Sequence, residues 1–130
     1  MKTLADLALN TAQVRGASYA DVRLVRRRTQ RVGVRNGAVS DMVEAETVGF
    51  GVRVIADGAW GFSSSARLER PEVERVAAEA VEIARASATV NREPVDIGPP
   101  EVHVDPYRTP SDTDPSAVPP EGERAPRLAA

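Results

Sequence analysis

The hydrophobic positions of the chain follow two periods, one typical of helices and one typical of strands. Residues 3–15 have the helical period, and their apolar stripe consists of Leu4, Leu7, Ala8, Thr11 and Val14. Gly16 follows, at a position where a left-handed C-terminal cap is favoured. The pattern predicts a short amphipathic helix at the start of the chain.

Residues 19–48 alternate between apolar and polar side chains, with Asn36-Gly37 in the middle. This dipeptide favours a type I′ turn, because both of its residues tolerate a positive φ. A two-residue loop sets a register whose polar cross-strand pairs are Arg27 with Glu46 and Thr29 with Glu44. The segment is therefore expected to form an antiparallel hairpin.

The segment GFGVRVIADGAWGF, residues 49–62, contains a second hairpin pattern with its turn at Asp57-Gly58. Pairing across a two-residue loop places Ile55 against Trp60 and Arg53 against Phe62. Arg53 is then within reach of both aromatic rings, and such a cation–π contact is worth about 0.5–2 kcal/mol. Phosphate binding is disfavoured, because a phosphate loop needs its glycines in a strand-to-helix turn.

Three glycines, Gly49, Gly51 and Gly61, leave notches in the strands of this second hairpin. A glycine inside a strand marks a bend, a bulge or the near approach of another backbone. The glycines therefore predict a bend, a bulge or a hairpin whose backbone is held close to another backbone.

Residues 70–88 form the clearest helical pattern, with Pro71 at a favourable first position. The predicted buried stripe consists of Val73, Val76, Ala77, Ala80, Ile83 and Ala84. Its many alanines imply close packing on a flat partner, most simply the sheet. The predicted fold is α+β: an N-terminal helix, an antiparallel meander of about four strands and a second helix packed on the sheet.

Composition divides the chain into a folded domain, residues 1–90, and a Pro-rich acidic linker or tail, residues 91–130. The net charge of the whole chain is −2, and nine of the ten prolines lie in the tail. Few tail residues are available to bury apolar surface and offset the entropy of ordering the segment. We expect a disordered tail.

Candidate catalytic chemistry is sparse. The sequence has no cysteine and a single histidine, His103, so a zinc site of the usual His-rich kind cannot form within this chain. Ser63, Ser64 and Ser65 have no nearby histidine to activate them. We predict no catalytic and no metal-binding residue. No apolar run is long enough for a membrane span, and a cytoplasmic location is the default expectation.

The basic run Arg26–Arg31 offers an alternative function, because clustered arginines can bind the nucleic-acid backbone. Pairing of these arginines with Glu44 and Glu46 across the hairpin is the simpler interpretation. No aromatic residue is interleaved with them, which further favours that interpretation. Nucleic acid is therefore an unlikely partner.

Three segments together, GASYADVRLVRRRTQRVGVRNG, ETVGFGVRVIADGAWGFSSS and RPEVERVAAEAVEIARA, resemble the N-terminal domain of the TldD/PmbA (TldE) family of zinc metalloproteases. Members were once described as modulators of DNA gyrase. The resemblance covers residues 4–90 in order. Its most specific part is a glycine–arginine–tryptophan signature, which includes Gly49, Gly51, Arg53, Trp60, Gly61 and Phe62.

The resemblance implies a longer protein with a zinc motif of the form HExxxH, a cleft that admits unfolded peptides and a related TldD- or TldE-type subunit. The motif is absent from this sequence, so activity of the chain alone is not expected and no zinc ligand is carried over. It also implies a truncated chain whose missing C-terminal domain or partner subunit completes the enzyme.

The favoured function is therefore a metallopeptidase N-terminal domain that shapes the peptide cleft and the subunit contact in proteolysis. The six signature residues are the candidate peptide-binding or structural residues, and their glycine notches would suit addition of an extended peptide strand. Two alternatives stay open: a nucleic-acid-binding module that uses the Arg-rich strand, and a non-functional gene remnant.

Overall fold

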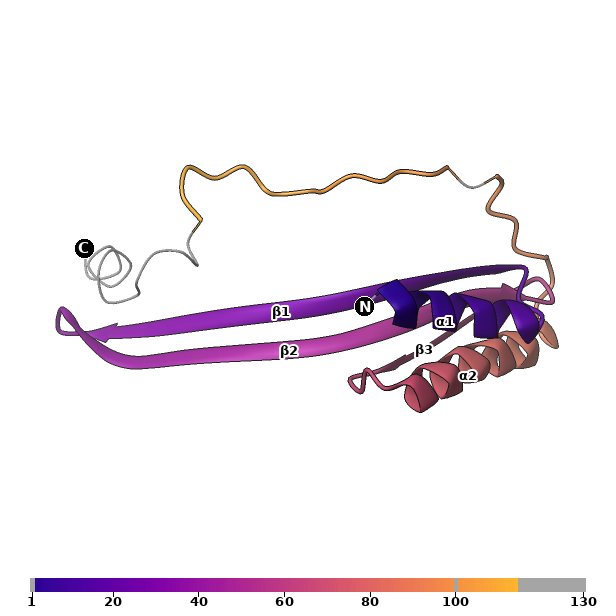
Figure 1. Cartoon of the computed structure of the whole chain (residues 1–130), viewed down its shortest axis with the longest axis horizontal. Helices are drawn as coiled ribbons and strands as arrows, with labels where there is room; N and C mark the ends of the chain where they lie inside the picture. Colours follow the sequence, from indigo (N-terminus) through magenta and orange to yellow (C-terminus); the bar gives the residue numbers. More distant parts are fainter. Residues whose placement is uncertain (1, 100, 115–130) are drawn as a thin grey trace. The chain divides into compact units, whose positions relative to one another are not determined.

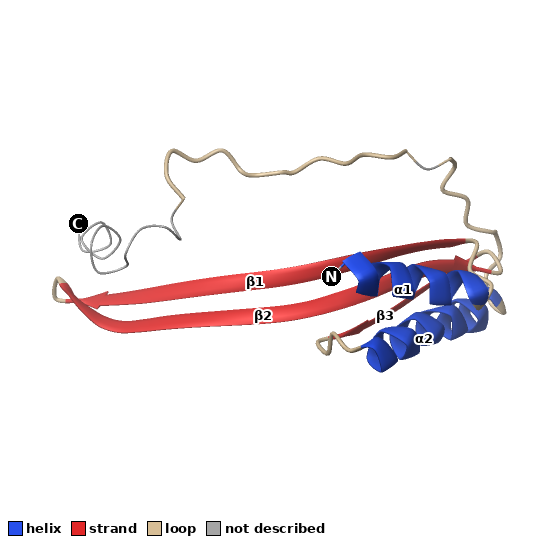
Figure 2. Cartoon of the chain, in the orientation of Figure 1, coloured by secondary structure: helices blue, strands red, loops and turns tan. Residues whose placement is uncertain are grey.

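The computed structural model describes residues 2–99 and 101–114, and its elements follow the order helix, three strands, helix (Figures 1 and 2). They are α1 (Lys2–Val14), β1 (Tyr19–Arg35), β2 (Ala38–Ala56), β3 (Ala59–Ser65) and α2 (Arg70–Ala88). The strands form one sheet in the order β1-β2-β3. The predicted α+β fold is thus confirmed.

The sheet has three strands in the described part of the chain, where the sequence suggested about four. The reason lies in β2, which runs without a break from Ala38 to Ala56. This strand is the second strand of the first hairpin and the first strand of the second hairpin. Two hairpins therefore need only three strands.

Both predicted turns are confirmed by the backbone. Asn36 and Gly37 have φ values of 52° and 76°, and Asp57 and Gly58 have values of 51° and 78°. These values suit type I′ turns, whose two central residues need a positive φ. In the second hairpin, Ile55 pairs with Trp60 and Arg53 with Phe62, as predicted.

Residues 2–27 and 47–99 make up one compact unit, and residues 28–46 with the described residues 101–114 belong to a second one. Within the second unit, Glu44 accepts hydrogen bonds from Arg28 at 3.1 Å and from Gln30 at 3.4 Å. The predicted pairing of Glu44 with Thr29 is therefore wrong, because alternate strand residues point to opposite faces. A one-residue shift in pairing between the turn and Glu44, as a β-bulge produces, accounts for the difference.

The core of the first unit lies between the helices and one face of the sheet (Figure 2). β2 contributes Phe50, Val52, Val54 and Ala56, and α2 contributes Val73, Val76, Ala77, Ala80, Val81 and Ala84. Two stripe predictions are wrong, each by two positions. Ile83 is exposed while Val81 is buried, and Val14 is exposed while Ala12 is buried.

Gly61 explains why α2 is rich in alanine. A Cβ atom at Gly61 would lie 2.0 Å from the carbonyl oxygen of Ala80 and 2.6 Å from the amide nitrogen of Ala84. The backbones of β3 and α2 thus meet at this point, so of the three meanings a strand glycine can have, the near approach of another backbone applies at Gly61. Small side chains on both sides permit the contact.

The described tail residues contain neither helix nor strand. The beginning of the tail forms two hydrogen bonds with the carbonyl oxygen of Gly58. The Asn91 side chain donates one at 2.8 Å and the Val95 amide donates the other at 2.9 Å. The last part of the predicted disordered tail, residues 115–130, lies outside the described residues. The predicted domain boundary near residue 90 stays a prediction. Among the described helices, none combines the length and apolar character needed to cross a membrane.

Candidate functional site

The second face of the sheet is the side turned away from the two helices. Phe50, Val52 and Val54 point toward the helices, so the intervening residues of β2 point to the other side. Those residues are Gly49, Gly51, Arg53 and Ile55. We call this side of the first unit the open face, because neither α1 nor α2 packs against it.

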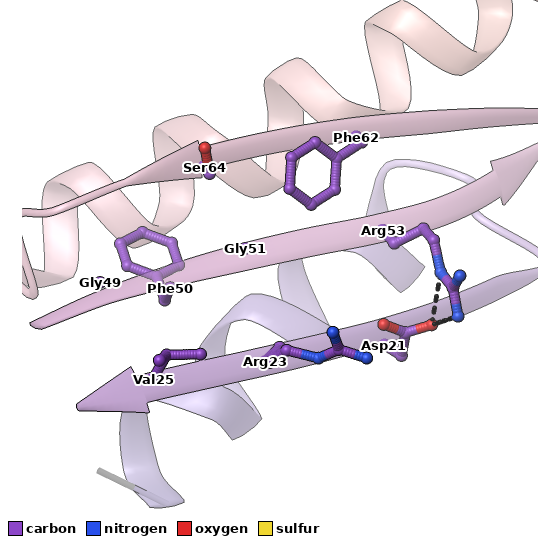
Figure 3. A pocket seen from close by; sticks show the side chains of 9 residues that line it. All are labelled: Asp21, Arg23, Val25, Gly49, Phe50, Gly51, Arg53, Phe62 and Ser64. Atoms are coloured by element: carbon purple, nitrogen blue, oxygen red, sulfur yellow. Dashed lines mark hydrogen bonds and ion pairs between the residues drawn. The ribbon is translucent and has the colours of Figure 1, made fainter. Parts of the chain in front are cut away.

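A hollow of about 360 Å³ lies on the open face (Figure 3). We call it the open-face hollow. It is lined by side chains and backbone from all three strands: Asp21, Arg23, Val25, Gly49, Phe50, Gly51, Arg53, Phe62 and Ser64. Two of its lining positions are glycines, so the middle strand fills little of the space.

The two glycines of the hollow differ in their surroundings. A Cβ atom at Gly51 would lie 2.9 Å from Cε2 of Phe62, so the ring of Phe62 occupies the notch at this residue. At Gly49 the nearest atom would be the carbonyl oxygen of Ser65, at 3.4 Å, which is an ordinary contact. The notch at Gly49 is therefore the unfilled one.

An aromatic and charged cluster lies at one end of the hollow. Arg53 donates two hydrogen bonds to the Asp21 carboxylate, at 2.9 and 2.8 Å, and Tyr19 donates a third to the same oxygen at 2.9 Å. The guanidinium of Arg53 lies 4.8 Å from the ring centre of Trp60, which confirms the predicted cation–π contact. Tyr19 packs edge-on against Trp60 with ring centres 6.1 Å apart.

The Asp21 carboxylate affects the titration of its neighbours. The hydrogen bond that Tyr19 donates to it raises the pKa of the tyrosine hydroxyl above 10.0. The same carboxylate raises the pKa of Arg53, again chiefly through hydrogen bonding. Both effects favour the neutral tyrosine and the charged arginine, so the cluster is electrostatically satisfied.

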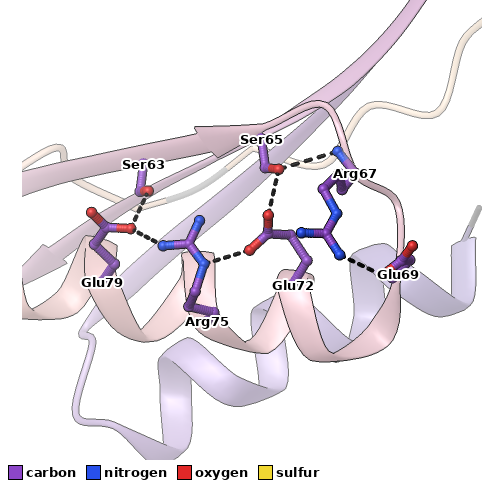
Figure 4. Close-up of polar contacts among 7 residues, drawn as sticks. All are labelled: Ser63, Ser65, Arg67, Glu69, Glu72, Arg75 and Glu79. Carbon is purple, nitrogen blue, oxygen red and sulfur yellow. Dashed lines mark hydrogen bonds and ion pairs between the residues drawn. The ribbon is translucent and has the colours of Figure 1, made fainter.

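The three serines have separate environments, and none is set up as a nucleophile. Ser63 donates to Glu79 at 3.1 Å and Ser65 donates to Glu72 at 2.9 Å, and Arg75 bonds both glutamates (Figure 4). Arg75, followed by Ser65, lowers the pKa of Glu72 below its ordinary value of 4.5. Ser64 lies on the opposite side of β3 and lines the hollow. The network fastens α2 to β3 and has no base to activate a hydroxyl.

The one histidine of the sequence, His103, contacts Glu101 at 3.2 Å and is exposed. No group of three or more His, Cys, Asp and Glu side chains suited to a metal occurs within residues 2–99 and 101–114. The zinc implied by the family resemblance therefore does not fit the described part of this chain.

Five of the six signature residues lie on the open face, and one does not. Gly49, Gly51, Arg53 and Phe62 line the hollow, and Trp60 stacks on Arg53 beside it. Gly61 alone faces α2. The first five can contribute to one binding surface, whereas Gly61 holds the helix against the sheet.

Sequence reasoning missed Tyr19, Asp21 and Arg23 as parts of this site. The register extrapolated from Asn36-Gly37 places Asp21 and Arg53 on opposite faces, because it lacks the one-residue shift. The available signal was the alternation of Tyr19, Asp21, Arg23 and Val25 itself, which sets these residues on one side of β1.

The outer edge of β3 is the other candidate feature. In the described sheet β3 pairs only with β2, so its second edge has no strand partner. Natural proteins commonly protect such edges with lysine, proline or a bulge. The strand AWGFSSS contains neither residue and pairs with β2 in unbroken register. This edge can accept another strand.

Comparison with known proteins identifies the family to which this chain belongs. A family model described as PmbA/TldA metallopeptidase domain 1 matches residues 20–84, which is half of the chain. The matched region runs from the start of β1 into α2 and so includes the sheet and its open face. The chain belongs to the PmbA/TldA (TldD) metallopeptidase family and corresponds to its first domain.

Solved structures show the same fold. TldE from Thermococcus kodakarensis is 14% identical with a TM-score of 0.62, over 81% of this chain and 23% of that one. A proposed modulator of DNA gyrase from Bacteroides thetaiotaomicron is 24% identical with a TM-score of 0.59, over 87% of this chain and 24% of that one. The chain thus spans about a quarter of these two structures. A search of the curated proteins finds no match.

Proposed function

We propose that this chain is the substrate-binding first domain of a TldD/PmbA-type metallopeptidase, and that it binds extended, unfolded peptides without carrying the zinc site. Membership of the metallopeptidase family supports the reaction class. The unpaired edge of β3 is the observation that carries the peptide-binding role. Hydrolysis would need residues outside the described part of this chain, because no metal-binding cluster occurs among the described residues.

The backbone of β3 is suited to strand addition. Ala56 and Ala59 flank the two-residue turn, so they form a hydrogen-bonded pair, and such pairs alternate along an antiparallel ladder. Trp60, Phe62 and Ser64 therefore direct their amide and carbonyl groups away from β2. An extended peptide can pair with these three residues, and main-chain hydrogen bonds then supply affinity with little sequence preference.

We also propose contact with a related subunit, because the fold is shared with TldE. The hairpin of the second unit offers exposed apolar side chains for it, namely Val39, Met42 and Val43. Exposed apolar side chains gain stability when a partner covers them. The contact is expected to bury them.

The nucleic-acid alternative has less support. Arg28 from the basic run forms an ion pair with Glu44 at 3.1 Å, in line with the simpler interpretation of that run. Nucleic-acid binding would appear as an affinity that falls steeply with salt. A titration with duplex DNA at low salt that shows no binding would dismiss it.

The peptide-binding proposal can be tested with a fluorescein-labelled unfolded peptide that has no acidic residues. Its binding to wild type is compared with its binding to the Ser64→Pro variant. Proline at this position removes an outward amide while the β2–β3 ladder stays intact. We expect wild type to raise the anisotropy of the peptide and Ser64→Pro to lose most of that binding. Ser64→Ala, the matched control, should bind as wild type does. Equal binding by wild type and Ser64→Pro would refute strand addition at this edge.

A further inference from the structure

The open-face hollow has a charge that the chain itself does not neutralise. The Asp21 carboxylate forms an ion pair with Arg53 and accepts a hydrogen bond from Tyr19. Arg23, which also lines the hollow, is exposed and makes no hydrogen bond or ion pair with any other described residue. The lining residues therefore carry one net positive charge, located on the Arg23 guanidinium.

The remaining surface of the hollow is apolar. Val25 and Phe62 are exposed there, with 44% and 57% of their surface accessible. Gly49 also lines the hollow and leaves open space beside these two residues, because no side chain projects from it. Such side chains gain stability when another apolar group covers them.

We propose that the open-face hollow binds an apolar side chain and the adjacent carboxylate of a partner polypeptide. In this arrangement a leucine- or phenylalanine-type side chain enters the notch over Gly49 and packs on Val25 and Phe62. A neighbouring aspartate or glutamate of the same partner accepts hydrogen bonds from Arg23. The occupant is thus a protein segment with an apolar–acidic residue pair.

Size and geometry agree with this occupant. A volume of about 360 Å³ is at the lower end of the range of small-ligand sites, about 300–1,000 Å³, and so suits one or two side chains. The guanidinium has a planar fork of donors that matches a carboxylate. A polyphosphate would need more positive charge or a helix N-terminus, and the hollow is lined by strands alone.

The site differs from the β3 edge proposed above. Strand addition uses outward backbone groups of β3. The hollow instead lies over β2 and binds side chains of the partner. One partner can use both sites, and because Phe62 and Ser64 belong to both, the hollow is best disabled on its own from β2. Gly49 is suited to this separation, because a Cβ atom there meets only ordinary contacts.

The test measures binding of three blocked tetrapeptides by NMR titration: acetyl-Gly-Leu-Glu-Gly-amide, the same peptide with glutamine for glutamate, and the same peptide with serine for leucine. We expect the Leu-Glu peptide to shift the backbone signals of Gly49, Gly51 and Phe62. The other two should bind about five- to tenfold more weakly, because each lacks one of the two contacts. Equal affinity for all three peptides would overturn the proposal.

Protein variants complete the test. Arg23→Ala should weaken the Leu-Glu peptide about five- to tenfold and leave the glutamine peptide unchanged. Gly49→Val should fill the notch and abolish tetrapeptide binding, while an unfolded peptide without acidic residues still binds at the β3 edge. Arg92→Ala, which removes an exposed charge from the tail, is the charge-matched control and should have no effect. Undiminished binding by both Arg23→Ala and Gly49→Val would contradict the proposed site, whatever the result at the β3 edge.

Discussion

Gly61 shows how a single missing side chain fixes the distance between two elements. A methyl group at this position would overlap backbone atoms of Ala80 and Ala84, which cannot rotate aside as a side chain can. The helix must then move away from the sheet or the strand must bend. Either movement loosens the core that α2 forms with β2.

We predict that Gly61→Ala lowers the free energy of unfolding by about 1–3 kcal/mol, the usual cost of overpacking. The midpoint of urea denaturation, followed by circular dichroism, measures the change. Gly49→Ala is the control, because its added methyl group makes only an ordinary contact. The same small effect for both substitutions would contradict the close contact between β3 and α2 at Gly61.

Glu72 links stability to pH. Its pKa is lowered in the folded chain, first by Arg75 and then by Ser65, so folding favours the charged form. This contribution is fully present above the ordinary value of 4.5, and it is lost as the pH falls through 4.5 toward the lowered folded pKa. We predict that wild type loses more stability between pH 6 and pH 3 than Glu72→Gln does. Parallel pH profiles of the two proteins would show that the ion pair contributes nothing.

At the scale of elements, the turn between β2 and β3 joins two parts of the fold. Gly58 has a φ of 78°, and its carbonyl oxygen accepts hydrogen bonds from Asn91 and Val95. A Cβ atom there would lie 3.1 Å from Cβ of Pro94. The turn therefore determines both the hairpin register and the course of the chain after α2.

We predict that Gly58→Ala destabilises the first unit by about 1–2 kcal/mol, because a non-glycine residue at positive φ is strained. Thermal unfolding monitored by circular dichroism provides the measurement. Gly98→Ala introduces the same kind of strain, with a φ of 71°, at a position where an added Cβ atom would meet nothing within 4 Å. That control should unfold as wild type does, and an equal loss in both variants would show that the turn has no special role.

Local signals predicted the elements well because each of them depends on neighbouring residues. Asn36-Gly37 and Asp57-Gly58 fixed the turns, and the alanine-rich pattern gave α2 with its correct bounds. The register of β1 against β2 was harder to predict, because a one-residue shift inside a long hairpin cannot be seen in the alternation of apolar and polar residues. That shift is why the Asp21–Arg53 pair, and with it part of the candidate site, could not be predicted.

At the scale of the whole molecule, we propose that this chain supplies a peptide-binding surface, and no metal-binding cluster occurs within residues 2–99 and 101–114. We predict that the purified 130-residue protein holds less than stoichiometric zinc and does not hydrolyse casein. Elemental analysis and a fluorescent casein assay provide the two readouts. Stoichiometric zinc accompanied by turnover would place an active site in this chain and contradict the division of roles proposed above.

The central claim is that the outer edge of β3 takes up an extended peptide, and amide hydrogen exchange at single residues tests it most directly. In the free protein, the amides of Gly61 and Ser63 should be protected by β2, whereas those of Trp60, Phe62 and Ser64 should exchange quickly. We predict that a saturating unfolded peptide slows exchange at these three outward amides and changes the other two little. Unchanged exchange at all three while the peptide is bound would contradict the account.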